Sequence, residues 1–332
     1  MRLEECFDKL REKIPSTVDE KYNSFYEFID AEFNDFIETL RSVDEKELLP
    51  IIKNELSEDY KTTKPFINLM EKICTFIKEN ILKEAYRGNI YQATTNLLKL
   101  LYYQKYTEGK LKDMYVNYFD FKITDENATL YRVRTIKQEG SDTDCNHLPF
   151  DKREKADNGR FSLNQYPCLY LADSKDTAIA ETITPKSDSN EDSKNNKLLI
   201  GKFHKNSKEP NLAFFYIGKP EPFKNCKDST FDIFKFLVTY PMSLVCLSTK
   251  KSGHIEKFES EYLVPQILFS ILFHDADEAK RGFKGIAYSS TQTDGINYAI
   301  PALMPKDEIL FKNHSTYIKD LLTQYDYEIN NY

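Results

Sequence analysis

Two arginines on one predicted strand are the first residues of this sequence that could do chemistry. Residues 129–135, TLYRVRT, have the composition of a β-strand. The two-residue period of a strand places Arg132 and Arg134 on one face and Tyr131 on the other. Two neighbouring guanidinium groups can bind a phosphate or a carboxylate through paired hydrogen bonds. A solvated edge strand carries such residues too, so the pair alone does not predict an anion site.

A carboxylate stands in a short predicted helix among small and apolar neighbours. The helix is expected over 174–184, after the apolar strand 168–173, with Asp173 or Ser174 as its cap. Glu181 lies about two turns into this helix, beside alanine and isoleucine residues. Such neighbours indicate a helix face that is turned inward, where a carboxylate needs a function because burying its charge is costly. Glu181 is therefore a candidate catalytic residue.

Two further segments could bring polar groups to a cleft. Gly159 permits a tight turn directly before Arg160. A later predicted strand, 284–290, is apolar and ends in Ser289 and Ser290, whose hydroxyls can donate hydrogen bonds. Each segment also has an ordinary interpretation, as a loop and as a strand end followed by a polar turn. The order of these segments along the chain supports a functional interpretation more strongly than either segment does alone.

Taken together, these segments resemble the RES domain, a family named for its Arg, Glu and Ser. The resemblance covers roughly 129–312. It comprises a Tyr-Arg strand, a Gly-Arg-aromatic turn, a Leu-Tyr-Leu-Ala strand and a late Gly-Ile-x-Tyr-x-Ser strand. The family Glu follows the Tyr of the third segment by eleven residues, as Glu181 follows Tyr170 here. Two positions depart from the pattern: Val133 stands where an aromatic residue is common, and Phe161 where Trp is common.

The resemblance implies an ADP-ribosyltransferase-like fold and an enzyme that degrades NAD, as do many bacterial toxins of this family that are held by an antitoxin. Matched residue by residue, it identifies Arg132, Glu181 and Ser290 as the catalytic residues. It also identifies Tyr170 as the family tyrosine, which would pack on the nicotinamide ring. The candidate substrate-binding residues are Tyr131, Arg134, Arg160, Tyr170 and Ser289.

This chemistry assigns a role to each catalytic candidate. Breaking the nicotinamide–ribose bond gives the ribose oxocarbenium-like character, which a nearby carboxylate stabilises. We therefore expect Glu181 to bind the ribose hydroxyls and Arg132 to hold the adjacent phosphate or ribose. Ser290 would orient the ribose or Arg132, and Arg160 would reach the pyrophosphate. NAD is then the substrate, and no other cofactor is expected. No metal is expected either, because the cysteines and the five histidines form no cluster with ligand spacing.

The acceptor of the ADP-ribosyl group stays open between water, phosphate and a protein side chain. Water or phosphate would make the protein an NAD glycohydrolase or an NAD phosphorylase. A protein acceptor would make it a mono-ADP-ribosyltransferase, and a non-catalytic NAD-binding module is a further alternative. An NAD-degrading enzyme would serve as a toxin of a toxin–antitoxin pair or in phage defence. Its expected partners are an antitoxin or a regulatory protein, and a second copy in a homo-oligomer.

Composition excludes other classes of protein. The chain has 332 residues and a formal net charge of −7, which argues against a general nucleic-acid binder. The uncharged stretches 236–249 and 262–273 are shorter than the ~20 apolar residues of a membrane span, so we expect buried core segments and no membrane partner. The first residues are charged throughout and lack the apolar core of a signal peptide, which predicts a cytoplasmic protein. Six scattered cysteines are typical of buried, reduced thiols.

Helical periodicity dominates the first ~120 residues. Thr17 and Glu20 fit a capping box before a long helix, in which apolar residues recur every three or four positions. A second helical pattern follows Pro65, and a third follows Asn89. We therefore predict a helical N-terminal part built from at least these three helices.

These expectations give an α+β protein of two domains. Residues 1–122 form a helical N-terminal domain for partner binding or regulation. Residues 123–332 form a RES catalytic domain with an ADP-ribosyltransferase-like mixed β core and flanking helices. The helical part loosely resembles the HEPN domains that accompany some RES proteins. The nuclease members of that class use an Arg-x4-6-His motif, and the first histidine here is His147, so no ribonuclease role is expected.

The remaining secondary-structure expectations concern the second half. The predicted strands are 129–135, 168–173, 197–203, 211–218, 284–290, 297–303 and 308–312. The predicted helices are 174–184, 231–247 and 255–274, and 186–196 is predicted to be a polar loop.

Overall fold

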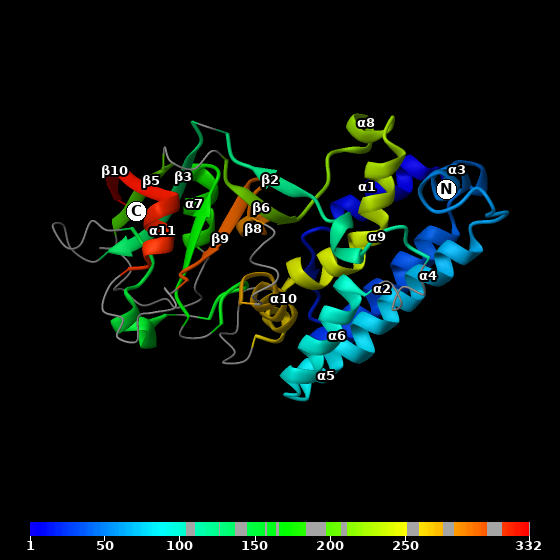
Figure 1. Cartoon of the computed structure of the whole chain (residues 1–332), viewed down its shortest axis with the longest axis horizontal. Helices are drawn as coiled ribbons and strands as arrows, with labels where there is room; N and C mark the ends of the chain where they lie inside the picture. Colours follow the sequence, from blue (N-terminus) through cyan, green and yellow to red (C-terminus); the bar gives the residue numbers. More distant parts are fainter. Residues whose placement is uncertain are drawn as a thin grey trace. The chain divides into compact units, whose positions relative to one another are not determined.

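The computed structural model describes most of the chain. The described residues are 1–103, 110–125, 127–136, 145–156, 158–163, 166–183, 197–206, 211–250, 259–274, 282–303 and 314–331. Over these residues the fold is α+β, as predicted, with helices in the first third and an eight-stranded sheet later in the chain (Figure 1). The predicted strand 308–312 and the predicted loop 186–196 lie outside the described residues.

The chain divides into two compact units. Unit 1 comprises Met1–Asp120, Ile217–Lys251 and Phe258–Ile271, and unit 2 comprises Phe121–Tyr216, Ser252–Lys257 and Leu272–Tyr332. The first boundary lies close to the expected one, and unit 1 also contains two segments from the second half of the chain. The assignment of 1–122 and 123–332 as functional domains stays a prediction.

Unit 1 is a bundle of helices. Its helices are α1 (Leu3–Glu12), α2 (Phe25–Arg41), α3 (Glu45–Glu55), α4 (Lys64–Phe76), α5 (Lys83–Tyr86), α6 (Ile90–Tyr102), α8 (Phe223–Cys226), α9 (Thr230–Leu247) and most of α10 (Leu263–His274). A π-helical segment, Ile77–Leu82, joins α4 to α5, and short 3-10 helices lie at Tyr115–Tyr118 and Ser260–Tyr262. Strands β1 (Thr17–Val18) and β7 (Thr249–Lys250) pair in parallel.

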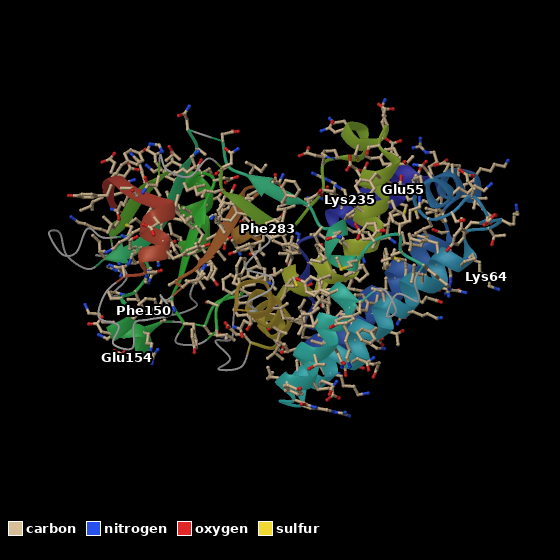
Figure 2. The ribbon with its side chains drawn as sticks, viewed as in Figure 1. Glu55, Lys64, Phe150, Glu154, Lys235 and Phe283 are labelled. Atoms are coloured by element: carbon tan, nitrogen blue, oxygen red, sulfur yellow. The ribbon has the colours of Figure 1, made fainter. Side chains whose placement is uncertain are left out.

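Helix α9 forms the centre of unit 1. The ring of Tyr240 stacks on that of Phe36 with 4.7 Å between centroids, and Tyr115 donates a 3.0 Å hydrogen bond to the carbonyl of Val238. By length and composition α9 could cross a membrane, but 78% of it is buried inside the fold, and the core helix of a soluble protein passes the same test. Its N-terminal part makes polar contacts. Lys235 forms ion pairs with Asp120 and Asp232, and Thr230 donates to Glu55; Figure 2 labels Lys235 and Glu55.

The expected helices are present, but one cap was assigned to the wrong residue. The predicted apolar stripe of α2 is buried, as are the stripes of α4 and α6. Helix α2 begins after Ser24, whose hydroxyl accepts a hydrogen bond from the backbone N–H of Glu27. The capping box at Thr17 is wrong, because Thr17 lies in β1 and pairs with Thr249.

Unit 2 is built on the eight-stranded sheet. In spatial order the strands are β10 (Leu322–Asn331), β5 (Lys197–Lys205), β3 (Thr129–Ile136), β4 (Cys168–Ala172), β9 (Ile296–Pro301), β8 (Phe283–Ser289), β6 (Ala213–Ile217) and β2 (Phe121–Ile123). The pairings β10–β5, β5–β3, β3–β4, β4–β9, β9–β8 and β6–β2 are antiparallel. Six of these strands were predicted, whereas β2 and β10 were not.

Strands β3 and β4 touch at one end only. Along β3 the register with β5 runs from Thr129 to Ile136, whereas β3 and β4 share the single pair Tyr131 and Ala172. The two strands therefore diverge within an otherwise continuous sheet. Such a divergence leaves room for side chains and a ligand between strands that would normally exchange backbone hydrogen bonds.

The two faces of the sheet are covered differently. On one face, Val133, Ala172 and Ile200 pack against Ala178 of helix α7 (Lys175–Thr182). A larger apolar cluster, which includes residues of β3, β4, β5, β6 and β9, occupies the other face together with α11 (Thr316–Leu321). Figure 1 shows α7 beside β3 in unit 2. All six cysteines of the chain are buried thiols, as expected.

The cap of α2 gives a test of the helical assignment. We expect Ser24→Ala to lower the free energy of unfolding by about 1 kcal/mol, because the N–H of Glu27 loses its acceptor. Thr17→Ala is the matched control and should change it by less than about 0.5 kcal/mol, because Thr17 is exposed in β1. Urea unfolding followed by circular dichroism measures both. A larger loss for Thr17→Ala would restore the original assignment.

Candidate active site

A cavity of about 280 Å³ lies in unit 2 where β3 and β4 diverge. It is lined by Tyr131, Arg132, Val133, Tyr170, Leu171, Ala172, Ala178, Glu181, Thr182, Tyr288 and Asn297. Strands β3 and β4 supply two walls, α7 supplies a third, and β8 and β9 contribute one residue each. The cavity thus brings together four of the predicted site residues: Tyr131, Arg132, Tyr170 and Glu181.

The carboxylate of Glu181 is fixed through one of its two oxygens. Its Oε1 accepts a hydrogen bond of 2.6 Å from the hydroxyl of Ser290 and one of 2.7 Å from the amide of Asn297. Both donors are nearly inaccessible, with 1% and 4% of their surface exposed, whereas Glu181 itself is half-buried. Within the part of the chain that the structure describes, Oε2 accepts no hydrogen bond, so this oxygen is available to a ligand in the cavity.

The hydroxyl of Ser290 is fully committed to its protein partners. It donates to Glu181 and accepts from the backbone N–H groups of Gln292 and Thr293 at 3.0 and 3.1 Å. A hydroxyl has one donor and two acceptor sites, so these three bonds use its whole capacity. From the sequence we expect Ser290 to orient the ribose or Arg132, whereas in the structure its hydroxyl donates to Glu181. Its geometry is that of a positioning residue.

Helix α7 is held in place from three directions. Its cap is Ser174, whose hydroxyl accepts from the N–H of Thr177 at 3.1 Å. Lys175 forms an ion pair with Glu328 of β10. At the other end, the hydroxyl of Thr182 lies 2.9 Å from the carbonyl of Ala178 in the helix and 3.4 Å from the carbonyl of Val133 in β3. Because Glu181 precedes Thr182, this end of the helix keeps the carboxylate close to β3, the strand that carries Arg132.

A chain of backbone contacts supports Arg132. Its Nη1 donates to the carbonyl of Cys145 at 3.0 Å, and the N–H of Cys145 donates to the side-chain oxygen of Gln324 in β10 at 2.7 Å. Gly201 lies opposite Arg132 in β5 and leaves space for Cys145. Burial raises the pKa of the Cys168 thiol, and the positive charge of Arg132 opposes this rise. The positive charge of Arg132 therefore lies near Cys168 of β4.

A tight turn fixes the ring of Tyr170. The Tyr170 hydroxyl accepts from the N–H of Phe161 at 3.0 Å and donates to the hydroxyl of Ser162 at 3.1 Å. A Cβ atom on Gly159 would lie 2.5 Å from the Tyr170 oxygen, so the turn needs glycine at this position. The predicted role of Gly159 in a tight turn is confirmed.

Arg160 belongs to the same turn but does not line the cavity. It is 7% exposed. Burial raises the pKa of Tyr288 well above its usual range; Tyr170 and Glu181 add to this shift, and the charge of Arg160 opposes it. The ring of Tyr288 packs on Phe161 with 4.9 Å between centroids. Arg160 therefore lies near Tyr288, one of the residues that line the cavity.

Besides Ser290 and Arg160, two further predicted residues, Ser289 and Arg134, are not part of the cavity lining, and two lining residues were missed. Ser289 is buried, with its hydroxyl 3.2 Å from that of Tyr216, and Arg134 follows Arg132 by two positions on β3. The missed residues are Tyr288 and Asn297. Tyr288 is the tyrosine of the late Gly-Ile-x-Tyr-x-Ser segment, so the motif already contained it. Asn297 has no such signal, because only the pairing of β9 with β4 and β8 places it at the cavity.

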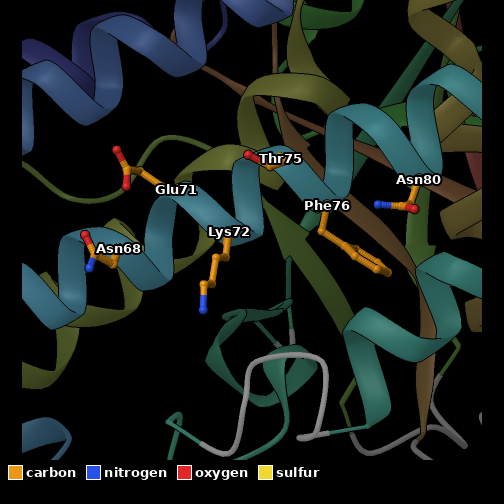
Figure 3. A pocket seen from close by; sticks show the side chains of 6 residues that line it. All are labelled: Asn68, Glu71, Lys72, Thr75, Phe76 and Asn80. Carbon is orange, nitrogen blue, oxygen red and sulfur yellow. The ribbon is translucent and has the colours of Figure 1, made fainter.

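Two hollows in unit 1 differ in chemistry from this cavity. One, of about 490 Å³, lies along α4 and the π-helical segment (Figure 3). Its lining residues all come from that single helical stretch: Asn68, Glu71, Lys72, Thr75, Phe76 and Asn80. The other, between α2 and α4, has charged walls in which Lys78 pairs with Asp30, and Arg41 pairs with Glu38 and Glu71. In the described part of the chain, no group of three or more His, Cys, Asp or Glu side chains could hold a metal ion.

Comparisons with known proteins agree with the expected family. The family model of the RES domain matches residues 129–226, a stretch that contains Arg132, Tyr170 and Glu181. The resemblance stated from the sequence is thereby confirmed over this stretch.

Two individual proteins are similar to the chain. A Bacillus subtilis (strain 168) protein named "Putative toxin YopC" is 29% identical over 196 residues, which are 53% of this chain and 41% of that protein. The match therefore spans less than half the length of this relative. Among solved structures, the M. tuberculosis MbcT-MbcA toxin-antitoxin complex gives a TM-score of 0.30 at 12% identity, covering 62% of this chain and 95% of the matched chain. A TM-score this low carries no argument about fold or function.

Arg132 is supported by Cys145, which packs against Gly201. This contact can be tested with a pair of substitutions that exchange side-chain volume between Gly201 and Cys145. In Gly201→Ala the new Cβ would lie 2.5 Å from Cβ of Cys145, so we expect a loss of about 1–3 kcal/mol in the free energy of unfolding. Cys145→Gly in the same chain would remove the obstructing atoms. The double variant should therefore lose less than the sum of the two single variants, which denaturant unfolding measures. Strictly additive losses would show that this contact is not the cause.

Proposed function

We propose that this protein is an enzyme that cleaves the nicotinamide–ribose bond of NAD, as an NAD glycohydrolase or NAD phosphorylase, and that it acts as a bacterial toxin. The observation that carries the proposal is Glu181, a carboxylate held through Oε1 with Oε2 left for a ligand in a cavity shared with Arg132. The RES match over 129–226 supports the reaction class. The similarity to a relative whose name describes a toxin supports the biological role.

The proposed reaction needs a carboxylate at the ribose and little else from the protein. The C–N bond breaks, its electron pair stays on the ring nitrogen, and nicotinamide leaves as a neutral molecule without needing a proton. Positive charge develops on the ribose ring and is stabilised by Glu181 Oε2, in the manner of glycosidase carboxylates. Water or phosphate then attacks the anomeric carbon; water gives up a proton to solvent, and phosphate attacks as an anion.

The other cavity residues bind and orient NAD. We assign Arg132 to holding a phosphate or the ribose, because it lines the cavity and its Nη1 is anchored to the carbonyl of Cys145. Tyr170 offers a ring whose orientation is fixed by the turn at Gly159, and we assign it to packing on nicotinamide. Tyr131 would complete this aromatic surface, and Arg160 would reach the pyrophosphate. NAD is the substrate in this scheme, and no other cofactor is invoked.

The cellular setting and the partners are part of the same proposal. An NAD-degrading toxin must work where NAD is abundant, so we place it in the cytoplasm, in a toxin–antitoxin pair or in phage defence. An antitoxin or a regulatory protein would restrain it, and the helices of unit 1 are candidates for contact with that partner or with a second copy.

Substitution of Glu181 tests the reaction. We expect Glu181→Gln to lower kcat for nicotinamide release by about 100-fold or more, because removing a charge that stabilises the transition state costs this much, with a small change in KM. Glu154→Gln is the matched control: Glu154, labelled in Figure 2, is exposed in the same unit, and its substitution should leave the rate unchanged. Chromatographic measurement of nicotinamide with purified protein decides the question. Equal rates for wild type and Glu181→Gln would remove the proposed mechanism.

Product analysis separates the alternatives. Incubation with NAD carrying an isotopic label in the adenine ring should give soluble ADP-ribose, or its phosphorylated form when phosphate is present, in amounts equal to the nicotinamide released. Label attached to a polypeptide would instead favour a mono-ADP-ribosyltransferase. NAD binding without any nicotinamide release would favour a non-catalytic NAD-binding module.

A further inference from the structure

We propose that Asn297 is a positioning residue for Glu181, which turns the carboxylate so that Oε2 faces the ribose. This inference rests on the proposed function. Asn297 lies in β9, paired with Ala172 of β4 on one side and with Tyr288 of β8 on the other. Residues paired in this way point to the same face of the sheet, so all three line the cavity.

Asn297 and Ser290 bind the same carboxylate oxygen from different parts of the fold. The amide nitrogen of Asn297 lies 2.7 Å from Oε1 of Glu181 and comes from the middle of the sheet. The hydroxyl of Ser290 lies 2.6 Å from the same oxygen and comes from the turn after β8. Because both donors converge on Oε1, the other oxygen is directed away from them and into the cavity.

Two donors prevent a rotation of the Glu181 carboxylate that a single donor would allow. The terminal torsion of a glutamate is broad, so a carboxylate held by a single hydrogen bond can still rotate. Ser290 cannot compensate for the loss of the amide, because its acceptor sites are occupied by Gln292 and Thr293 and its donor is already used. Without Asn297, Oε2 would leave its position at the ribose, while the contacts of Arg132 and Tyr170 with NAD would persist.

The chemical type of the residue also fits this role. Asn297 is 4% exposed, and its neutral amide satisfies a carboxylate oxygen without neutralising it. A lysine or arginine at this position would form an ion pair and compete with the positive charge that develops on the ribose. A neutral donor therefore holds Glu181 and leaves its charge available to the transition state.

Steady-state kinetics of nicotinamide release test the assignment. We expect Asn297→Leu to lower kcat about 10- to 100-fold with KM changed less than about threefold, because misplacement by ~1 Å costs this much in rate but leaves binding contacts intact. Asn297→Asp has the same shape, lacks the donor and places a second carboxylate beside the first. It should lose at least as much and keeps the test valid if the leucine variant does not fold. Tyr317→Phe, which removes a hydrogen bond to the carbonyl of Lys284 in the same unit, is the control and should retain wild-type kinetics.

A second background distinguishes positioning from general structural support. The Glu181→Gln variant no longer has a carboxylate to orient. Adding Asn297→Leu to it should therefore lower the residual rate of nicotinamide release no further. Equal fold-losses in both backgrounds, or an active Asn297→Leu protein within twofold of wild type, would overturn the assignment while leaving the proposed function standing. A folded wild-type protein that releases no nicotinamide would instead overturn the proposed function, and the positioning role with it.

Discussion

The candidate site depends on the pair of buried hydrogen bonds that converge on Oε1 of Glu181. A half-buried carboxylate without donors would cost free energy and would move, and either effect would spoil it for stabilising charge on a bound ligand. The hydrogen bonds from Ser290 and Asn297 offset the cost of burial and hold the carboxylate still, and both are made to the same oxygen. These two donors bind only Oε1, so the two oxygens of Glu181 differ, and this asymmetry defines the direction in which the proposed reaction would use the carboxylate.

The divergence of β3 and β4 is the second constraint, because it makes the cavity possible. Beyond Tyr131 and Ala172 these strands no longer pair, and the polar groups of that region find other partners. Arg132 donates to the carbonyl of Cys145, which is itself held by Gln324 of β10. The same edge strand holds Lys175 at the start of α7 through Glu328. Strand β10 therefore steadies both the arginine and the helix that carries the carboxylate, although it contributes no residue to the cavity lining.

Patterns within short segments predicted most of the helices and strands, whereas some of the missed features depend on pairing between distant segments. The apolar stripes of α2, α4 and α6, the alternation of β3 and the apolar run of β5 are properties of short segments, so they could be predicted from the sequence. Strand β10 was missed although residues 325–330, YDYEIN, alternate between apolar or aromatic and polar side chains, a pattern that favours a strand. Thr17 and Ser24 both begin plausible caps, and only the pairing of Thr17 with Thr249 excludes the first. In the site, Glu181 and Arg132 could be predicted from their neighbours and the family resemblance, whereas Asn297 depends on the register of β9 between β4 and β8.

The path of the chain gives the site an order of assembly. After β6 the chain contributes α8, α9 and most of α10 to unit 1, and only then supplies β8 and β9 to unit 2. Arg132 and Glu181 therefore leave the ribosome long before Ser290 and Asn297. A nascent or truncated chain that stops before β8 has the carboxylate of Glu181 but neither of the donors that orient it. For the proposed enzyme, the site therefore stays incomplete until translation has passed the last two strands that contribute to the cavity.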